Sequence, residues 1–172
     1  LPGYDFVSED SPGQFATAND GDGRDGDASD PGDWLDAALA GSPSSGLAGC
    51  PVQDSSWHGT RVAGIIGAMA NNGTGVVGID WNARILPVRV LGRCGGLTSD
   101  IVAGMRWAGG LDVPGIPANP TPARVINLSL GGPRNSRILQ SAVDHALKMG
   151  VVVVAAAGNS GSSVGYPGAS EG

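Results

Sequence analysis

The chain has 172 residues, of which 41% are hydrophobic and 15% are charged, and its formal net charge is −6. This length and hydrophobic content suit one globular domain and argue against a disordered chain, and no apolar run is long enough to predict a membrane span. The acidic balance disfavours nucleic acid and anionic membrane surfaces as partners, because both require a basic face. Glycine and proline, at 30 and 12 residues, predict many tight turns.

The first half of the chain is predicted to be mostly loop before a regular segment begins. A stretch rich in Gly, Pro, Ser and Asp shows little hydrophobic periodicity as far as Trp57, and Asn71-Asn72-Gly73 signals the end of the first long helix. The predicted elements are, in order, a strand at 4–7, a helix over 59–70 and a strand at 83–91.

The second half alternates helices and strands. The predicted elements are, in order, a helix that Ser99 or Asp100 caps and that runs to Trp107, a loop over 113–122, a strand at 124–130, a helix that Ser136 caps and that runs to Met149, and a strand at 151–157. Gly150 ends the second helix in the left-handed conformation. The unbroken apolar run at 151–157 is typical of a strand buried on both faces. We therefore predict an α/β fold, a doubly wound parallel sheet with helices on both faces, whose ligands bind at the carboxyl ends of the strands.

His58 opens the first predicted helix in the tetrad Trp57-His58-Gly59-Thr60. Histidine is the side chain whose unperturbed pKa lies nearest neutrality, so a positioned imidazole can act as a general base. A helix-start histidine without a catalytic role is the alternative. A metallohydrolase centred on His58 is disfavoured, because no second His or carboxylate stands at ligand spacing from it.

Asn159 directly follows the last predicted strand, so its side-chain amide can donate a hydrogen bond at the carboxyl end of the sheet. A donor aimed at the developing oxyanion of acyl transfer lowers the barrier by about 3–4 kcal/mol. An asparagine that only forms a turn is the alternative. At the same end of the sheet, Gly131-Gly132 predicts an open backbone edge against which another chain can lie.

Two further patterns concern cysteines and aspartates. Cys50 and Cys94 form no metal-binding pair, so a disulfide in an oxidising compartment is favoured over two buried thiols. Six aspartates lie between Asp20 and Asp33 with only Arg24 to offset them. Clustered carboxylates on Gly-rich turns can bind calcium through oxygen, and a solvated acidic loop is the alternative.

Three motifs occur in a fixed order along the chain: His58-Gly59-Thr60 with Val62-Ala63-Gly64, then Leu128-Ser129-Leu130-Gly131-Gly132, then Ala156-Ala157-Gly158-Asn159. Together they strongly resemble the subtilisin-like serine proteases, the subtilases of peptidase family S8. Other segments, among them 3–7, 30–34 and 88–96, are similar to the secreted bacterial branch of that family. The resemblance implies a secreted, extracellular serine endopeptidase that hydrolyses extended protein or peptide substrates through an acyl-enzyme.

Matched by position, the resemblance implies that His58 is the general base and that Asn159 binds the oxyanion. It implies substrate contacts at Cys94, Gly95, Gly96, Leu97, Ser129, Leu130, Gly131, Gly132, Ala156, Ala157 and Gly158. The first four match the strand that pairs with the upstream part of the substrate, and the others match pocket walls. Ser129 does not match the nucleophile. We expect the pocket to accept large or apolar side chains.

The resemblance also implies stabilising elements. It favours a disulfide between Cys50 and Cys94, the bridge shared by this branch, whereas the second bridge of its relatives is absent. It favours a structural calcium ion, with ligands expected at Asp5, Asp20, Asp22, the carbonyl of Arg24, Asp25 and Asp33. Asp10 and Asp27 are alternative ligands.

The family completes its triad with an aspartate in Asp-Thr-Gly and a serine in Gly-Thr-Ser-Met-Ala, and neither string occurs in this sequence. We therefore interpret 1–172 as part of a single peptidase S8 catalytic domain that lacks the segments with the catalytic Asp and Ser. The isolated chain is expected to be inactive, and the remaining segments of its own domain are expected partners. A non-catalytic, calcium-stabilised peptide-binding module or pseudoprotease is the alternative from another class.

Overall fold

The computed structural model describes residues 1–161 and 163–170 and divides the chain into two compact units. Unit 1 is Leu1–Gly96 and unit 2 is Leu97–Gly172. None of the helices in the described part has both the length and the apolar character needed to cross a membrane.

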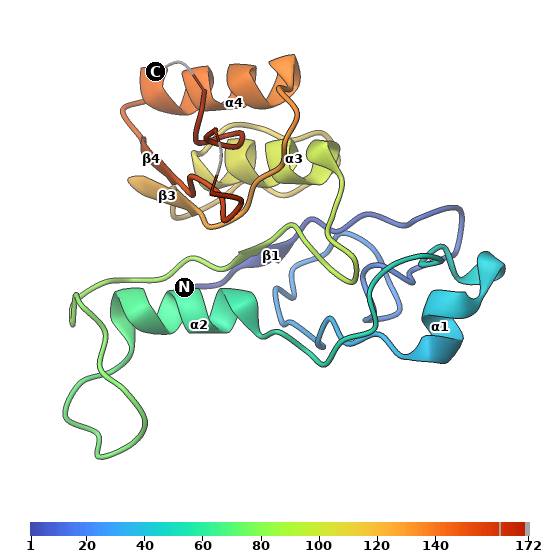
Figure 1. The fold of residues 1–172 in the computed structure, drawn as a ribbon. Coiled ribbons are helices and arrows are strands. Elements are labelled where there is room, and N and C mark those ends of the chain that lie inside the picture. Colours follow the sequence, from blue (N-terminus) through green and yellow to red (C-terminus); the bar gives the residue numbers. More distant parts are fainter. Residues whose placement is uncertain (162, 171–172) are drawn as a thin grey trace. The chain divides into compact units, whose positions relative to one another are not determined.

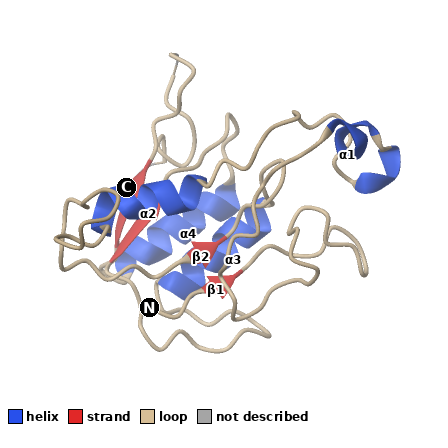
Figure 2. Cartoon of the chain, turned by 90° about the horizontal axis from the view of Figure 1, so that it is seen from below, coloured by secondary structure: helices blue, strands red, loops and turns tan. Residues whose placement is uncertain are grey.

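Unit 1 consists largely of loops and turns built around one short parallel strand pair (Figure 2). β1 (Tyr4–Asp5) pairs with β2 (Val88–Arg89), so that Asp5 lies opposite Arg89. The strands are shorter than the predicted segments 4–7 and 83–91. The core begins directly after β1, and its side chains that are at most 3% exposed are Phe6, Val7, Ala18, Leu35 and Leu47.

A short helix interrupts the stretch that was predicted to be loop. α1 (Ala37–Gly41) begins after Asp36, whose Oδ1 accepts a 2.8 Å hydrogen bond from the amide of Leu39, and η1 (Pro43–Ser45) follows it. An aspartate N-cap satisfies an amide that the first turn of a helix leaves without a partner, which explains how so short a helix forms.

α2 (His58–Gly67) confirms the first long helix but ends three residues before the predicted end at 70. Its last carbonyls are satisfied by the chain that returns after a long loop, visible beyond the end of α2 in Figure 1. The amides of Gly78, Ile79 and Asp80 donate to the carbonyls of Ala68, Ile65 and Ile66 at 2.9–3.0 Å. Gly78 allows this approach, because a Cβ there would lie 2.4 Å from the nitrogen of Ala68.

Unit 2 contains a second parallel strand pair and two helices that lie side by side (Figure 1). β3 (Val125–Leu128) pairs with β4 (Val152–Ala155), and α3 is Thr98–Ala108 and α4 is Arg137–Lys148. The buried side chains of α4 recur at helical spacing and are Leu139, Ala142, Val143 and Ala146. They make α4 a one-sided, amphipathic helix.

The predicted boundaries of α4 are confirmed, whereas the predicted cap of α3 is wrong. Ser136 Oγ accepts a 3.3 Å hydrogen bond from the amide of Leu139, and Gly150 has a φ of 77°. In α3 the N-cap is Leu97, which makes no side-chain capping bond, and Asp100 lies within the first turn at 1% exposure. Ser99 also lies inside the helix.

The strands are parallel, as predicted, and each described pair lies within one unit: β1 pairs with β2 in unit 1, and β3 pairs with β4 in unit 2. β4 was predicted to be buried on both faces, and this is wrong here. Val152 and Val154 are 54% and 49% exposed, while Val153 and Ala155 are half-buried. Successive side chains of a strand point to opposite faces, so one face of β4 packs inward and the other is exposed in the described chain.

Candidate active site

His58 is the first residue of α2, and its side chain is exposed. The residue before it, Trp57, has a φ of 48° and a ψ of 34°, the left-handed conformation, and makes no side-chain capping bond. Left-handed backbone is unfavourable for a bulky residue by about 1–2 kcal/mol. The chain therefore enters the helix at His58 through a strained turn that neighbouring contacts must hold.

Ser56, the residue before Trp57, forms two hydrogen bonds with Asp33. The amide of Ser56 donates to Asp33 Oδ1 at 2.5 Å, and the Ser56 hydroxyl donates to Asp33 Oδ2 at 2.7 Å. On the other side of the turn, the Arg61 guanidinium donates to the carbonyl of Ser56, and the Arg61 amide donates to the carbonyl of Trp57 at 3.0 Å. Ser56 is thus hydrogen-bonded through its amide, its hydroxyl and its carbonyl.

The charge of Asp33 responds to this environment. Burial is the largest single influence and raises the pKa of Asp33, but the hydrogen bonds from Ser56 and the charge of His58 act in the opposite direction. Their combined effect lowers the pKa below its ordinary value of 3.8. Asp33 is therefore ionised at neutral pH and adds a negative charge to the surroundings of His58.

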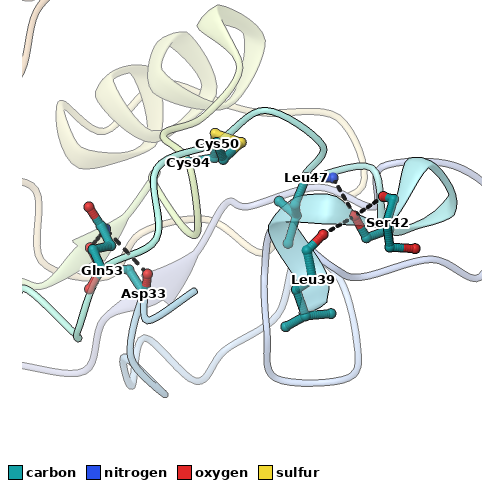
Figure 3. The surroundings of a disulfide bond; sticks show 8 residues. Asp33, Leu39, Ser42, Leu47, Cys50, Gln53 and Cys94 are labelled. Atoms are coloured by element: carbon teal, nitrogen blue, oxygen red, sulfur yellow. Dashed lines mark hydrogen bonds between the residues drawn. A yellow bond between two sulfur atoms is a disulfide. The ribbon is translucent and has the colours of Figure 1, made fainter. Parts of the chain in front are cut away.

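The segments 32–35 and 53–56 lie antiparallel, and we call them the entry pair because they precede His58. Leu35 and Gln53 exchange backbone hydrogen bonds of 2.8 and 3.0 Å, and the Trp34 amide donates to Ser55 Oγ at 3.2 Å. Figure 3 shows the Gln53 side chain directed at Asp33, whose carbonyl it approaches at 3.4 Å. The entry pair thus extends from the Asp33–Ser56 contact to the Leu35–Gln53 bridge.

The predicted disulfide between Cys50 and Cys94 is confirmed, with the two Cα atoms 5.8 Å apart (Figure 3). Cys94 and Gly95 have φ values of 64° and 107° and form a tight turn that Gly92 and Gly95 close with backbone hydrogen bonds of 2.8 and 3.3 Å. Residues 94–95 therefore form a turn and not an extended strand. Gly96 and Leu97, the other two predicted substrate contacts in this segment, are exposed.

Arg93 connects this turn to the entry pair. Its Nε donates to the Trp34 carbonyl at 3.0 Å, and its guanidinium carbon lies 4.4 Å from the centroid of the Trp34 ring. Arginine over an indole ring is a favourable cation–π arrangement. Burial lowers the pKa of Arg93 and nearby Asp36 opposes that effect. Sequence reasoning did not identify this residue, because nothing in its spacing links it to Trp34.

Two of the predicted calcium ligands, Asp5 and Asp20, share one buried arginine. Arg89 Nη1 donates to Oδ2 of both aspartates, and its Nη2 donates to the carbonyl of Ala18. Burial raises the pKa of Asp5 to about 6, against the opposing effects of the Val7 amide and Arg89, and Asp20 adds to the increase. Burial of the Asp5 carboxylate disfavours its charged form and is the largest contribution, which accounts for this direction.

These contacts do not fit a calcium ion shared by Asp5 and Asp20, because the Arg89 guanidinium already bridges them. Of the other expected ligands, Asp25 pairs its backbone with Asp5 at 2.9 and 3.2 Å, and Asp33 holds Ser56. The amide of the exposed Asp22 donates a hydrogen bond to Oδ1 of Asp20, and Arg24 Nε donates to the carbonyl of Phe6. Across residues 1–161 and 163–170, no group of three or more His, Cys, Asp or Glu side chains is arranged to hold a metal ion.

In unit 2, Asn159 is exposed beyond the end of β4, as are Ala156, Ala157 and Gly158 before it. The carbonyl of Ala157 accepts a 3.0 Å hydrogen bond from the amide of Gly165. Ala156–Asn159 therefore follows the carboxyl end of a parallel strand, in the position that the sequence predicted.

The backbone edge at Gly131-Gly132 was predicted to be open, and at Gly132 this is wrong. Gly132 and Tyr166 exchange two backbone hydrogen bonds of 2.9 Å, so Gly132 already has a partner within unit 2. Gly131 approaches the same segment so closely that a Cβ would lie 2.9 Å from the Tyr166 carbonyl. The half-buried Ser129 and Leu130 precede this contact, and Ser129 Oγ accepts a 2.9 Å hydrogen bond from Asn127.

The region of this chain that matches a known protein family contains the three sequence motifs. The profile of a family described as "Subtilase family" matches residues 39–172, a range that includes His58 and Asn159. An extracellular protease of Xanthomonas campestris is 50% identical over 165 residues, which are 95% of this chain and 27% of that protein. An extracellular basic protease of Dichelobacter nodosus is 45% identical, over 92% of this chain and 25% of that protein.

Among solved structures, a protease from Pseudoalteromonas arctica superimposes with a TM-score of 0.80 at 52% sequence identity, covering 92% of this chain and 44% of the other. The chain thus spans about a quarter of the length of the curated relatives above and less than half of this solved structure.

Proposed function

This chain belongs to the subtilase family, and from that membership we propose that it forms part of a serine endopeptidase that cleaves peptide bonds in extended protein substrates through an acyl-enzyme. The observation that carries the proposal is the single family match over 39–172, which contains all three sequence motifs in order. The exposed position of His58 at the start of α2 supports it, since a general base must reach a substrate-bound hydroxyl.

In this proposal His58 removes the proton from a serine hydroxyl and returns it to the leaving amine, while an aspartate orients the imidazole. The proposal requires a serine and an aspartate that these 172 residues do not supply in the family's motifs. The carboxylate is needed on physical grounds, because the positive end of the α2 dipole opposes a charged imidazole at its first residue.

We assign the oxyanion-binding role to Asn159. Its support is an exposed amide beyond the carboxyl end of β4, where ligands bind in parallel sheets. For the substrate, we propose contacts at the exposed Gly96 and Leu97 and at the small residues 156–158, with 129–132 as a further wall. Large or apolar side chains are the proposed preference of the pocket.

We further propose that the protein is secreted. Its support is the Cys50–Cys94 disulfide, which persists in oxidising compartments, together with the extracellular relatives. A calcium requirement is also proposed, and the ligands retained in this proposal are Asp22, Asp25 and the carbonyl of Arg24. Metal analysis before and after chelation, read against the melting temperature, tests calcium independently of activity.

The proposed function is tested by casein hydrolysis with the full-length gene product that contains this sequence. His58→Ala is expected to reduce turnover by about 10⁴-fold or more, as the loss of a triad member does. The matched control is His145→Ala, because His145 lies on the exposed face of α4 and its Nδ1 contacts the carbonyl of Ser141. A wild-type protein that binds peptides without cleaving them would replace this proposal with a pseudoprotease.

A further inference from the structure

We propose that Asp33 is a positioning residue for His58: its carboxylate clamps Ser56 and thereby fixes the strained turn at Trp57 from which α2 begins. The inference rests on the proposed function, in which His58 is the general base. The inference assigns a role to a residue outside the three motifs. Asp33 lies 23 positions before Ser56 in the sequence. We call the Asp33–Ser56 contact the clamp.

The clamp restrains both the backbone and the side chain of one residue. Asp33 Oδ1 accepts from the Ser56 amide at 2.5 Å and Oδ2 accepts from the Ser56 hydroxyl at 2.7 Å, so the two carboxylate oxygens hold Ser56 at two points. Hydrogen bonds to an ionised acceptor are about twice as strong as those between neutral groups. A two-point contact also fixes orientation, which a single bond does not.

The strain lies between the clamp and the catalytic residue. Trp57 is held in the left-handed region although it is neither glycine nor asparagine, and such conformations persist only where the surroundings over-determine them. The clamp restrains the chain before Trp57, and the contacts of Arg61 with Ser56 and Trp57 restrain it afterwards. Without the clamp, Trp57 is free to relax towards negative φ, which reorients the first residue of α2, His58.

Asp33 is itself anchored in a closed circuit of contacts in unit 1. Trp34 contacts Arg93, Arg93 precedes Cys94, and the disulfide joins Cys94 to Cys50. The circuit closes through the Leu35–Gln53 bridge of the entry pair. The segment that carries Asp33 is therefore held in place by several contacts. Through its hydrogen bonds Asp33 restrains Ser56 and the chain before His58.

The test uses four variants of the full-length gene product. Asp33→Ala removes the clamp, Asp33→Asn keeps one acceptor for the Ser56 amide, and Ser56→Ala removes the hydroxyl bond alone. Asp54→Ala is the matched control, because Asp54 is an exposed carboxylate only four residues before His58. All proteins are compared at equal folded fraction, measured by near-ultraviolet circular dichroism.

Asp33→Ala is expected to lower kcat for a peptide substrate by about 10-fold to 100-fold, the range that follows from a small misplacement of a catalytic group. KM is expected to stay unchanged, and Asp33→Asn is expected to recover most of the loss. The kcat of Ser56→Ala should lie between those of Asp33→Ala and Asp33→Asn, and the kcat of Asp54→Ala should equal that of the wild type. Equal losses in Asp33→Ala and Asp54→Ala would overturn the proposal in favour of a general charge effect.

A second readout does not depend on activity. Asp33→Ala is expected to shift the NMR resonances of the His58 imidazole and the amides of 56–60, with smaller changes in Asp33→Asn and none in Asp54→Ala. A folded Asp33→Ala protein with unchanged His58 resonances overturns the positioning role. If the wild type cleaves no substrate, the proposed function fails, and the resonance shifts still decide whether Asp33 positions His58.

Discussion

Asp33 accepts two hydrogen bonds from Ser56, one from the backbone amide at 2.5 Å and one from the hydroxyl at 2.7 Å. The contact joins an acidic loop to the segment that enters α2. It therefore couples the ionisation of one carboxylate to the order of the chain immediately before His58.

The first prediction concerns pH. The pKa of Asp33 in the folded chain lies below its ordinary value of 3.8, so the stability that its charge contributes is present above 3.8 and is lost as the pH falls through the lower folded pKa. Wild type should therefore exceed Asp33→Asn in melting temperature at neutral pH, and the difference should vanish in acid. A difference that is constant over the whole pH range would show that the charge of Asp33 plays no part.

Arg89 offers a second prediction. Arg89→Met leaves the buried Asp5 and the half-buried Asp20 without their shared cation, and breaking a buried ion pair from one side costs about 3–5 kcal/mol. Urea denaturation measures the loss in free energy of unfolding. Arg124→Met, at an exposed arginine before β3, should change that free energy by no more than about 0.5 kcal/mol. Similar effects of the two substitutions would contradict the role of Arg89.

The disulfide supplies a third prediction. Cys50 and Cys94 are 44 positions apart, and closing a loop of this length stabilises a chain by about 4 kcal/mol in the entropic model. We expect the double variant Cys50→Ser/Cys94→Ser to lose about 2–4 kcal/mol, because strain and residual unfolded structure reduce the ideal value. The oxidised wild type treated with a reductant should show the same loss, and an unchanged unfolding midpoint would refute it.

A fourth prediction tests the strained turn. Asparagine tolerates the left-handed region and a β-branched residue does not, so Trp57→Val should be less stable than Trp57→Asn by about 1–2 kcal/mol. Both variants remove the same half-exposed indole, so the loss of the indole is common to both and does not enter their difference. Equal stabilities would mean that residue 57 changes its φ at little cost.

The sequence predicted α2 and α4 well, because local sequence signals mark each of these helices. Ser136 and Gly150 mark the two ends of α4, and its apolar residues recur at helical spacing. α1 was not predicted because five residues are too few to show a period, although Asp36, a residue type favoured at helix N-caps, was a usable signal for its start. One face of β4 is exposed because no element of the described chain covers that face. The apolar run at 151–157 does not indicate which elements cover each face of the strand.

In the candidate site, residues in contiguous motifs could also be predicted, whereas contacts between distant segments could not. His58 and Asn159 lie in contiguous motifs and could be identified from single segments. The Asp33–Ser56 clamp and the Gly132–Tyr166 pair join residues 23 and 34 positions apart, and no periodicity relates them. Asp33 was expected to bind calcium because the resemblance to the subtilases favoured a calcium site in the acidic loop, whereas the structure directs both of its carboxylate oxygens to Ser56.

The most direct measurement of the central claim is labelling by a fluorophosphonate probe, which reacts with a serine that a neighbouring base activates. In the full-length gene product we expect labelling of one serine, a rate at least about 10³-fold lower in His58→Ala, and a wild-type rate in His145→Ala. Residues 1–172 alone should remain unlabelled. An unlabelled wild-type protein, or equal labelling of wild type and His58→Ala, would contradict the account.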